Sequence, residues 1–288
     1  MFGRRTGRSN RAGSQDQPPR RTGALSNDRT QTGRWPPFLH QPNVPCPHGG
    51  AVCRAWGNDD FAPPAPVDIV RMAVAQHDNG WYEWEIAPKL RGDGVPMDFV
   101  HDDDPVGKVA LWRRGIDRAA QQHPYAGVLI SGHAARLYGT YPGHGLSAAA
   151  QEAIQRFVDD HARQVETLRA AWADQPAMQR WLAPAHLDAN ITLLQFCDVA
   201  ALQVQMPWER RRIFSDVPVD YAGATTDVTM TWDDDTIAFA PWPYRVHDFT
   251  VSVHGRVPAR QTFADDADYR QALDAAPVAV MTWRVAAG

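Results

Sequence analysis

Hydrophobic residues recur every three or four positions from about residue 40 to residue 206, and this spacing predicts amphipathic helices. After Pro207 the pattern changes to alternating apolar and polar residues, which predicts strands. The loss of period at repeated Gly, Pro and Asp between residues 81 and 105 predicts a long ordered loop. The expected helices cover residues 47–56, 68–77, 106–121, 124–138, 147–173, 187–205 and 266–275, and the expected strands are DVTMTW, TIAFA, FTVSVHGRV and VAVMTWRV.

The two periods together predict a fold class and a division of the chain. We expect a mainly α protein whose helical core carries a small C-terminal antiparallel β appendage. Residues 1–38 have no hydrophobic period and are expected to be a disordered basic extension. The helical domain should cover residues 39–206, and the β-rich subdomain residues 207–288.

Charge and composition limit the classes of partner that we expect the protein to bind. Residues 1–36 carry eight Arg against two Asp, a charge of +6, so the remaining residues sum to −10 within the chain's total of −4. An acidic body argues against a specific nucleic-acid groove. No apolar run approaches the roughly 18 residues of a membrane span, and three cysteines leave an odd number, which suits a reducing compartment. We expect a cytoplasmic protein without a membrane contact, while the oligomeric state stays open.

Several residues that commonly bind metals lie on the apolar faces of the expected helices. Asp198 occupies the apolar stripe between Leu194 and Leu202, where an ionised carboxylate is disfavoured unless it is paired or binds a metal. His77 and Asp78 close an apolar helical run. His133 and His48 also fall on inward faces.

Imidazole nitrogens and carboxylate oxygens together suit a divalent transition metal such as Mn, Fe, Co or Zn. Each residue alone also has an ordinary explanation. A single inward His is usually a hydrogen-bonded core residue, Asp78 fits the polar end of a helix, and an Arg from another helix would neutralise Asp198. The coincidence of several such residues favours the metal.

The order of His48, then His77 and Asp78, then Asp198 in LLQFCDVAALQ resembles the H…HD…D pattern of the HD-domain metal-dependent phosphohydrolases. Over a longer span, from about residue 41 to the C-terminus, the chain is similar to an uncharacterised bacterial family of unknown function. The segments that carry this second resemblance are WGNDDF, AQHDNGWYEWE, GVPMDF and PYAGVLISGHAARL.

The HD resemblance implies an HD-like metal-binding core at residues 39–206, with His48, His77, Asp78 and Asp198 as ligands of one metal. His133, and with it His161 on another inward stripe, resembles the extra histidines of members that hold two ions. The chain lacks the HH and GYP signatures, so hydrolysis of cyclic dinucleotides is not supported.

The implied reaction is hydrolysis of a small phosphorylated substrate, a nucleotide or a metabolite, by a metal-activated water. Asp78 would orient this water, and His133 would lie within reach of a second ion or the substrate. The nearest cations in sequence for phosphate oxygens are Lys89, Arg91 and Lys108, although each is equally well explained as a solvated surface charge. Trp81 and Trp112 are expected to wall the substrate pocket or to be core aromatics.

Two other functions remain open. Some proteins of the HD superfamily use a di-iron centre with six ligands for oxygenation, and His133 with His161 would complete such a set. Alternatively the protein is not an enzyme, and its metal centre is structural or vestigial. The identity of the metal separates the first two functions.

Overall fold

The computed structural model of the protein describes residues 47–139, 146–205, 210–233 and 235–288, and at positions 47, 48, 204 and 205 it describes the backbone alone. The disordered extension expected at residues 1–38 lies outside these ranges. None of the helices formed by the described residues combines the length and the apolar character needed to cross a membrane.

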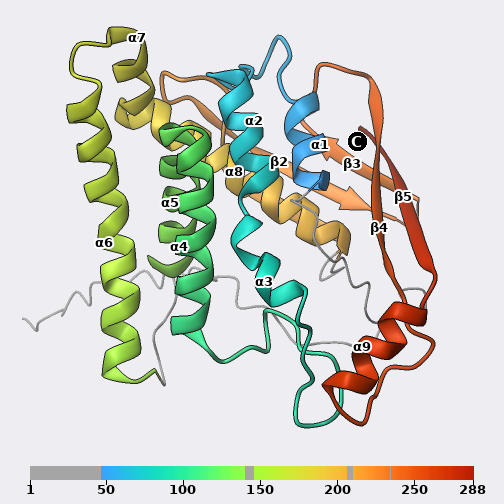
Figure 1. The fold of residues 1–288 in the computed structure, drawn as a ribbon. Helices are drawn as coiled ribbons and strands as arrows, with labels where there is room; N and C mark the ends of the chain where they lie inside the picture. Colours follow the sequence, from blue (N-terminus) through green and yellow to red (C-terminus); the bar gives the residue numbers. More distant parts are fainter. Residues whose placement is uncertain (1–46, 140–145, 206–209, 234) are drawn as a thin grey trace, which may run out of the picture. The chain divides into compact units, whose positions relative to one another are not determined.

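The helices occupy the first part of the described chain and agree with the hydrophobic spacing (Figure 1). Residues 81–105 are less irregular than expected, because a 3-10 turn and the short helix α3 come before the loop. Ser147 caps α6 by accepting a hydrogen bond from the backbone N–H of Ala150. The helices are α1 (Pro47–Ala55), α2 (Val67–Gln76), α3 (Tyr82–Glu85), α4 (Pro105–Gln122), α5 (Pro124–Gly139), α6 (Ala148–Ala171), α7 (Pro176–Gln179), α8 (Pro184–Gln205) and α9 (Asp266–Ala275).

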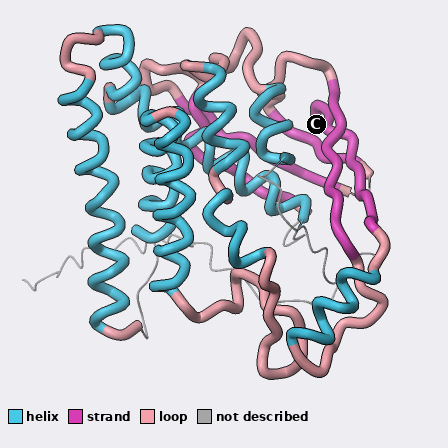
Figure 2. Tube along the Cα trace, viewed as in Figure 1, coloured by secondary structure: helices cyan, strands magenta, loops and turns pink. Residues whose placement is uncertain are grey.

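The strands, drawn in magenta in Figure 2, form one mixed sheet. Their order in the sheet is β1-β2-β3-β5-β4. Neighbouring strands are antiparallel except β3 and β5, which are parallel. The strands are β1 (Arg211–Pro218), β2 (Thr225–Trp232), β3 (Thr236–Ala240), β4 (Asp248–Arg256) and β5 (Val278–Ala287).

The predicted fold class, a mainly α protein with a small antiparallel appendage, is wrong. Of the residues that the structure describes, about 19% lie in strands and about 52% in helices, so the sheet is a major part of the fold. The sheet is mixed because the chain runs from β4 through α9 and returns as β5 between β3 and β4. The short turns between the strand patterns favour hairpins, so the position of β5 between β3 and β4 depends on tertiary packing.

The first strand was also missed. In β1 the apolar residues stand beside three consecutive arginines, and the register shifts between Phe214 and Val217. Asp216 has a positive φ of 57° at this irregularity. A bulge breaks the strict alternation by which strands are recognised in sequence.

Helices and sheet share one hydrophobic core. Trp56, just after α1, is 1% exposed and contacts the rings of Phe61, Phe196 and Tyr244 edge-on, at centroid distances of 5.5, 5.0 and 5.9 Å. The backbone of Trp56 also forms an isolated bridge with that of Tyr244, between β3 and β4. Because Phe196 belongs to α8, Trp56 joins α1 and α8 to the sheet.

We expect Trp56→Ala to lower the free energy of unfolding by about 3–5 kcal/mol, the usual cost of removing a large aromatic side chain from a core. Chemical denaturation followed by circular dichroism measures this change. Val278→Ala on β5, where the side chain is 61% exposed, is the control and should stay within about 0.5 kcal/mol of the parent. Equal effects of both changes would show that Trp56 does not join the layers.

Candidate metal centre

His77 and Asp78 lie at the end of α2, where the chain turns sharply against α4. His77 is the C-cap residue of α2, and Asp78 precedes the 3-10 turn formed by residues 79–81. Gly80 is buried in this turn, and a Cβ atom there would lie 2.0 Å from the carbonyl oxygen of Leu111. On the facing side, a Cβ atom at Gly115 would lie 2.8 Å from the backbone nitrogen of Gly80. Two glycines therefore let α4 approach the turn that carries the His-Asp pair.

Arg118 of α4 also holds this turn in position through its side-chain contacts. Its guanidinium donates a 2.8 Å hydrogen bond to the carbonyl oxygen of Asn79 and forms an ion pair with Glu83. Arg114 also pairs with Glu83, at 2.9 Å. These contacts hold the pKa of Glu83 well below its usual value, at about 2, so this carboxylate stays charged and linked to α4.

His133 and Asp198 come from two helices that pack against each other and against α2. His133 lies in α5, in which every residue from Tyr125 to Ala135 is buried. Asp198 lies in α8 and is 7% exposed. The centre is thus built from three separate helices.

His77, His133 and Asp198 form a buried group that could hold a metal ion. One ligand atom from each residue lies within 4.8 Å of the other two. Nε2 of His77 is 3.2 Å from Oδ1 of Asp198, and Nε2 of His133 is 3.5 Å from Oδ2 of the same carboxylate. The two imidazole rings are nearly perpendicular, with centroids 5.5 Å apart. The two histidines face different oxygens of one carboxylate.

The ring of His77 is oriented by a backbone carbonyl. Nδ1 lies 2.8 Å from the carbonyl oxygen of Val74, which only accepts hydrogen bonds, so Nδ1 carries the proton. Nε2 then faces Oδ1 of Asp198 and Oδ2 of Asp78, each at 3.2 Å. Two carboxylate oxygens and a bare ring nitrogen repel one another unless a cation joins them. Either a second proton on His77 or a metal ion fills this role.

The pKa values of the centre are consistent with this conclusion. Burial by itself lowers the pKa of His77, but the charges of Asp78 and Asp198 and their hydrogen bonds outweigh burial and raise it well above the ordinary value. Burial likewise works to raise the pKa of Asp198, and the hydrogen bond and charge of His77 overcome it, so that pKa is lowered. A pair of opposite charges results when no metal is bound.

His133 behaves differently from His77. Burial lowers its pKa to about 4, so the ring is neutral at neutral pH. Neither ring nitrogen makes a hydrogen bond with the described residues. A buried imidazole without a partner requires an explanation, and a neutral nitrogen facing a buried carboxylate is a ready metal ligand.

Two of the predicted ligands, Asp78 and His161, are not part of this group, and the structure does not describe the side chain of His48. Asp78 contacts His77, but its side chain is 41% exposed and is not one of the three clustered residues. The backbone of His48 lies in the first turn of α1, and its side chain is outside the described atoms. His161 of α6 lies near Gly132, where its Cε1 would be 2.9 Å from a Cβ atom, and it is not in the clustered group.

The two predicted aromatic residues lie beside the centre. The Trp112 ring packs edge-on against His133, with centroids 5.6 Å apart, and Trp81 packs against Trp112 at 6.4 Å. Both side chains belong to or border the core. The aromatic row therefore runs from the buried histidine toward the turn after α2.

Two of the three predicted cations make contacts away from the buried group, and the third is exposed. Arg91 pairs with Asp93 within its own loop, and the Lys108 ammonium donates to the carbonyl oxygen of Asp102. Lys89 is exposed. Neither of these two contacts joins a cation to the clustered residues.

Sequence reasoning missed Glu85, at the end of α3. Burial raises its pKa to about 7, and the negative charge of Asp78 adds to the shift. Burial raises the pKa of Tyr269 in α9 to about 12, and the charge of Glu85 adds to the shift, so α9 lies near the same carboxyl group. A single Glu in an irregular segment carries no signal that would have revealed this environment.

Comparison with known proteins gives a family and no activity. No curated protein and no solved structure matches the chain. The family model described as "Protein of unknown function (DUF3891)" matches residues 47–258, a span that includes the two histidines and the aspartate of the buried group. The similarity to a family of unknown function expected from the sequence is thereby confirmed, and the chain belongs to the DUF3891 family.

Proposed function

We propose that the protein is a metal-dependent hydrolase whose ion is held by His77, His133 and Asp198. The observation that carries the proposal is the meeting of two imidazoles and one carboxylate from three helices in a buried position. Nitrogen and oxygen ligands of this kind suit Mn, Fe, Co or Zn. Asp78 faces the same ring nitrogen of His77 as Asp198 does, which makes it a candidate for a further ligand.

A bound divalent ion would supply a nucleophile at neutral pH by lowering the pKa of a bound water. The chain's own residues supply the rest of the reaction. Asp78 is half-exposed and faces the ligand nitrogen of His77, so it is placed to accept a hydrogen bond from the attacking water. Glu85, with a pKa of about 7, suits proton transfer to a leaving group at neutral pH.

The proposed substrate is a small phosphoester, such as a nucleotide or a phosphorylated metabolite. Support comes from the ligand order, because a His-Asp pair followed far along the chain by a single Asp resembles the motif of HD-domain phosphohydrolases. Trp112 and Trp81, which follow one another away from His133, offer aromatic surface for the organic part of the substrate.

A second candidate function follows from the composition of the site. Two histidines and one carboxylate are also the ligand set of mononuclear iron enzymes that activate oxygen. This candidate predicts tightly held iron, whereas the hydrolase predicts an exchangeable divalent ion. A purely structural ion is the third possibility, and it predicts retention of metal without turnover.

We expect each molecule of the purified protein to hold about one divalent ion and to lose this ion when a ligand residue is substituted. Asp198→Asn and His133→Gln should each weaken binding by at least about tenfold, since changes even to outer-shell partners cost 10–100-fold. Elemental analysis and metal titration measure this loss. Asp117→Asn, an exposed carboxylate on α4, is the control. Equal metal content in the parent and the three variants would show that Asp198 and His133 do not bind the ion.

The metal-free protein should become less stable as the pH rises. His77 has a folded-state pKa above its unfolded value of about 6.5, so its contribution to stability is complete below pH 6.5 and is lost as the pH rises through the folded-state pKa. Each unit of difference between the two pKa values is worth about 1.4 kcal/mol.

Thermal unfolding with a chelator, at several pH values from 6 upward, tests this expectation. Added Mn²⁺ should reduce the loss of stability at high pH, because the metal replaces the proton between His77 and the carboxylates. His77→Gln should remove most of the pH dependence. A parent protein whose stability is unchanged over this range would contradict the assigned charge of His77.

With Mn²⁺ present, we expect hydrolysis of p-nitrophenyl phosphate, bis-p-nitrophenyl phosphate or a nucleoside phosphate. Asp198→Asn should be inactive, and Asp117→Asn should match the parent. Glu85→Gln should lower kcat by about a hundredfold, the usual contribution of general acid–base catalysis, and should remove a fall in activity above pH 7. Steady-state kinetics across pH measures both effects.

Three other outcomes would overturn the proposal that this metal centre catalyses hydrolysis. An inactive parent that holds iron firmly and consumes oxygen supports the second candidate. An inactive parent that holds an ion without oxygen consumption supports the structural centre. Activity that persists in Asp198→Asn shows that hydrolysis does not use this centre.

A further inference from the structure

The three helices that carry the clustered ligands are also joined by a buried amide, separate from the metal centre. Asn190 of α8 is 0% exposed. Its Nδ2 donates a 2.9 Å hydrogen bond to the carbonyl oxygen of Ala65, two residues before α2 begins. The same nitrogen donates at 3.0 Å to the hydroxyl oxygen of Tyr125, in the first turn of α5. One amide group of α8 therefore contacts the starts of both other helices.

The orientation of this amide is fixed by Tyr221, in the turn between β1 and β2. The Tyr221 hydroxyl donates to Oδ1 of Asn190 at 2.9 Å and accepts a 2.6 Å hydrogen bond from the backbone N–H of Ala65. Burial raises the pKa of Tyr221 to about 12, so its hydroxyl keeps the proton that it donates. The hydroxyl of Tyr125 donates in turn to the carbonyl oxygen of Trp181, at 3.0 Å. We call Ala65, Tyr125, Asn190 and Tyr221 the Asn190 cluster, and its hydrogen bonds define a single arrangement of these groups.

Each helix runs from the Asn190 cluster to one of the three ligands. Tyr125 precedes His133 by eight residues in α5, and eight residues of α-helix span roughly 12 Å. Asn190 precedes Asp198 by the same number of residues in α8. The ten residues of α2 end immediately before His77. Because a helix is a rigid element, the relative positions of the three helices at the cluster carry over to the three ligands.

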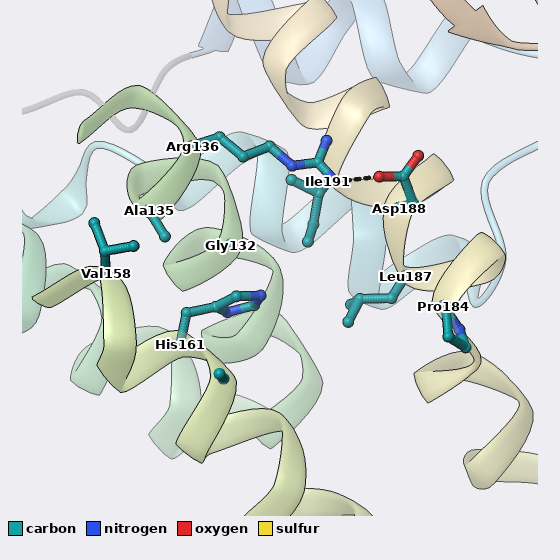
Figure 3. Close-up of a pocket in the computed structure, with 10 residues that line it drawn as sticks. Gly132, Ala135, Arg136, Val158, His161, Pro184, Leu187, Asp188 and Ile191 are labelled. Carbon is teal, nitrogen blue, oxygen red and sulfur yellow. Dashed lines mark hydrogen bonds and ion pairs between the residues drawn. The ribbon is translucent and has the colours of Figure 1, made fainter. Parts of the chain in front are cut away.

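Side-chain packing alone does not fix α5 against α8 near the metal centre. A largely apolar cavity of about 310 Å³ lies between α5, α6 and α8 (Figure 3). It borders Gly132, which adjoins His133 in sequence, and Ile191, which adjoins Asn190. Atoms that line a void lose their packing contacts on that side. The position of α5 relative to α8 therefore depends on hydrogen bonds as well as on packing.

A second polar contact joins α5 to α8 on the other side of His133. Nη1 of Arg136 donates to Oγ1 of Thr192 at 2.8 Å, and Nη2 pairs with Asp188, as Figure 3 shows. Tyr125 and Arg136 thus fix α5 to α8 at two points that enclose His133 in the sequence. At the start of α2, the hydrogen bonds to Ala65 are the corresponding contact with α8.

We propose that Asn190 is a positioning residue of the metal centre, which sets the distances among His77, His133 and Asp198 by joining the starts of α2, α5 and α8. The inference rests on the proposed function only in treating these three side chains as metal ligands. Distances in a metal site must be correct to within about 0.2 Å, so a small shift of one helix weakens binding. A cluster that served stability alone would leave the ligand geometry unchanged when it is broken in a protein that still folds.

Titration of the full chain with Co²⁺, followed by visible absorption, measures both the affinity and the coordination geometry. Asn190→Ala removes the hydrogen bonds to both other helices, so it should weaken Co²⁺ binding by at least about tenfold and change the shape of the spectrum. Val228→Ala, at a buried position of β2, is the matched control, because it removes core packing and leaves the cluster intact. Its Co²⁺ affinity and spectrum should match those of the parent.

A second measurement needs no metal. We expect the ring NMR signals of His77 and His133 in the metal-free protein to move in Asn190→Ala and to stay in place in Val228→Ala, at one fixed pH. This measurement separates the two proposals. A parent protein that does not bind Co²⁺ contradicts the metal centre, whereas ring signals that do not move in Asn190→Ala contradict the positioning role.

Tyr125→Phe removes a single hydroxyl group from the cluster and is the milder variant. It should weaken Co²⁺ binding about threefold, in line with the net contribution of one hydrogen bond, and should move the ring signals of His133. If Asn190→Ala does not fold, as judged by circular dichroism, Tyr125→Phe decides the outcome. Ring signals and Co²⁺ affinity that match the parent in the folded cluster variant, or equal changes in Val228→Ala, would overturn the proposal.

Discussion

The buried carboxylate of Asp198 is the constraint on which the centre of this protein depends. An ionised carboxyl group away from water requires a nearby positive charge or a metal. The fold meets this requirement by bringing His77 and His133 to opposite oxygens of the same group. One histidine is charged and the other neutral in the absence of a metal, because only His77 faces a second carboxylate.

The surrounding structure serves to hold these three side chains at fixed positions. The contact between Gly80 and Gly115 sets the depth of the turn after α2, and Arg118 holds that turn to α4. On the other side, Trp56 and Phe196 link α1 and α8 to the sheet. The sheet thus supports the helix that carries Asp198, although it contributes none of the three clustered ligands.

Helix α5 separates two chemically different environments at successive residues. His133 faces α2 and α8 beside a buried carboxylate, whereas Gly132 borders an apolar cavity edged by Arg136 and His161. Arg136 also contributes to the lowered pKa of both His133 and His161, so its charge acts on both environments.

The helices were predictable from sequence, because each buries a stripe of apolar residues that recurs at the period of its own backbone. The same reasoning identified His77, His133 and Asp198, since a polar residue on an apolar stripe needs a partner wherever that stripe is buried. Three other features had no signal in the sequence. The place of β5 between β3 and β4, the environment of Glu85 beside Asp78, and the position of His161 in a cavity away from the clustered residues depend on contacts between distant segments. The sequence by itself determined which residues are buried on each helix, because burial follows local periodicity. Only the tertiary structure decided which of those residues meet, because that depends on how the helices and strands pack together.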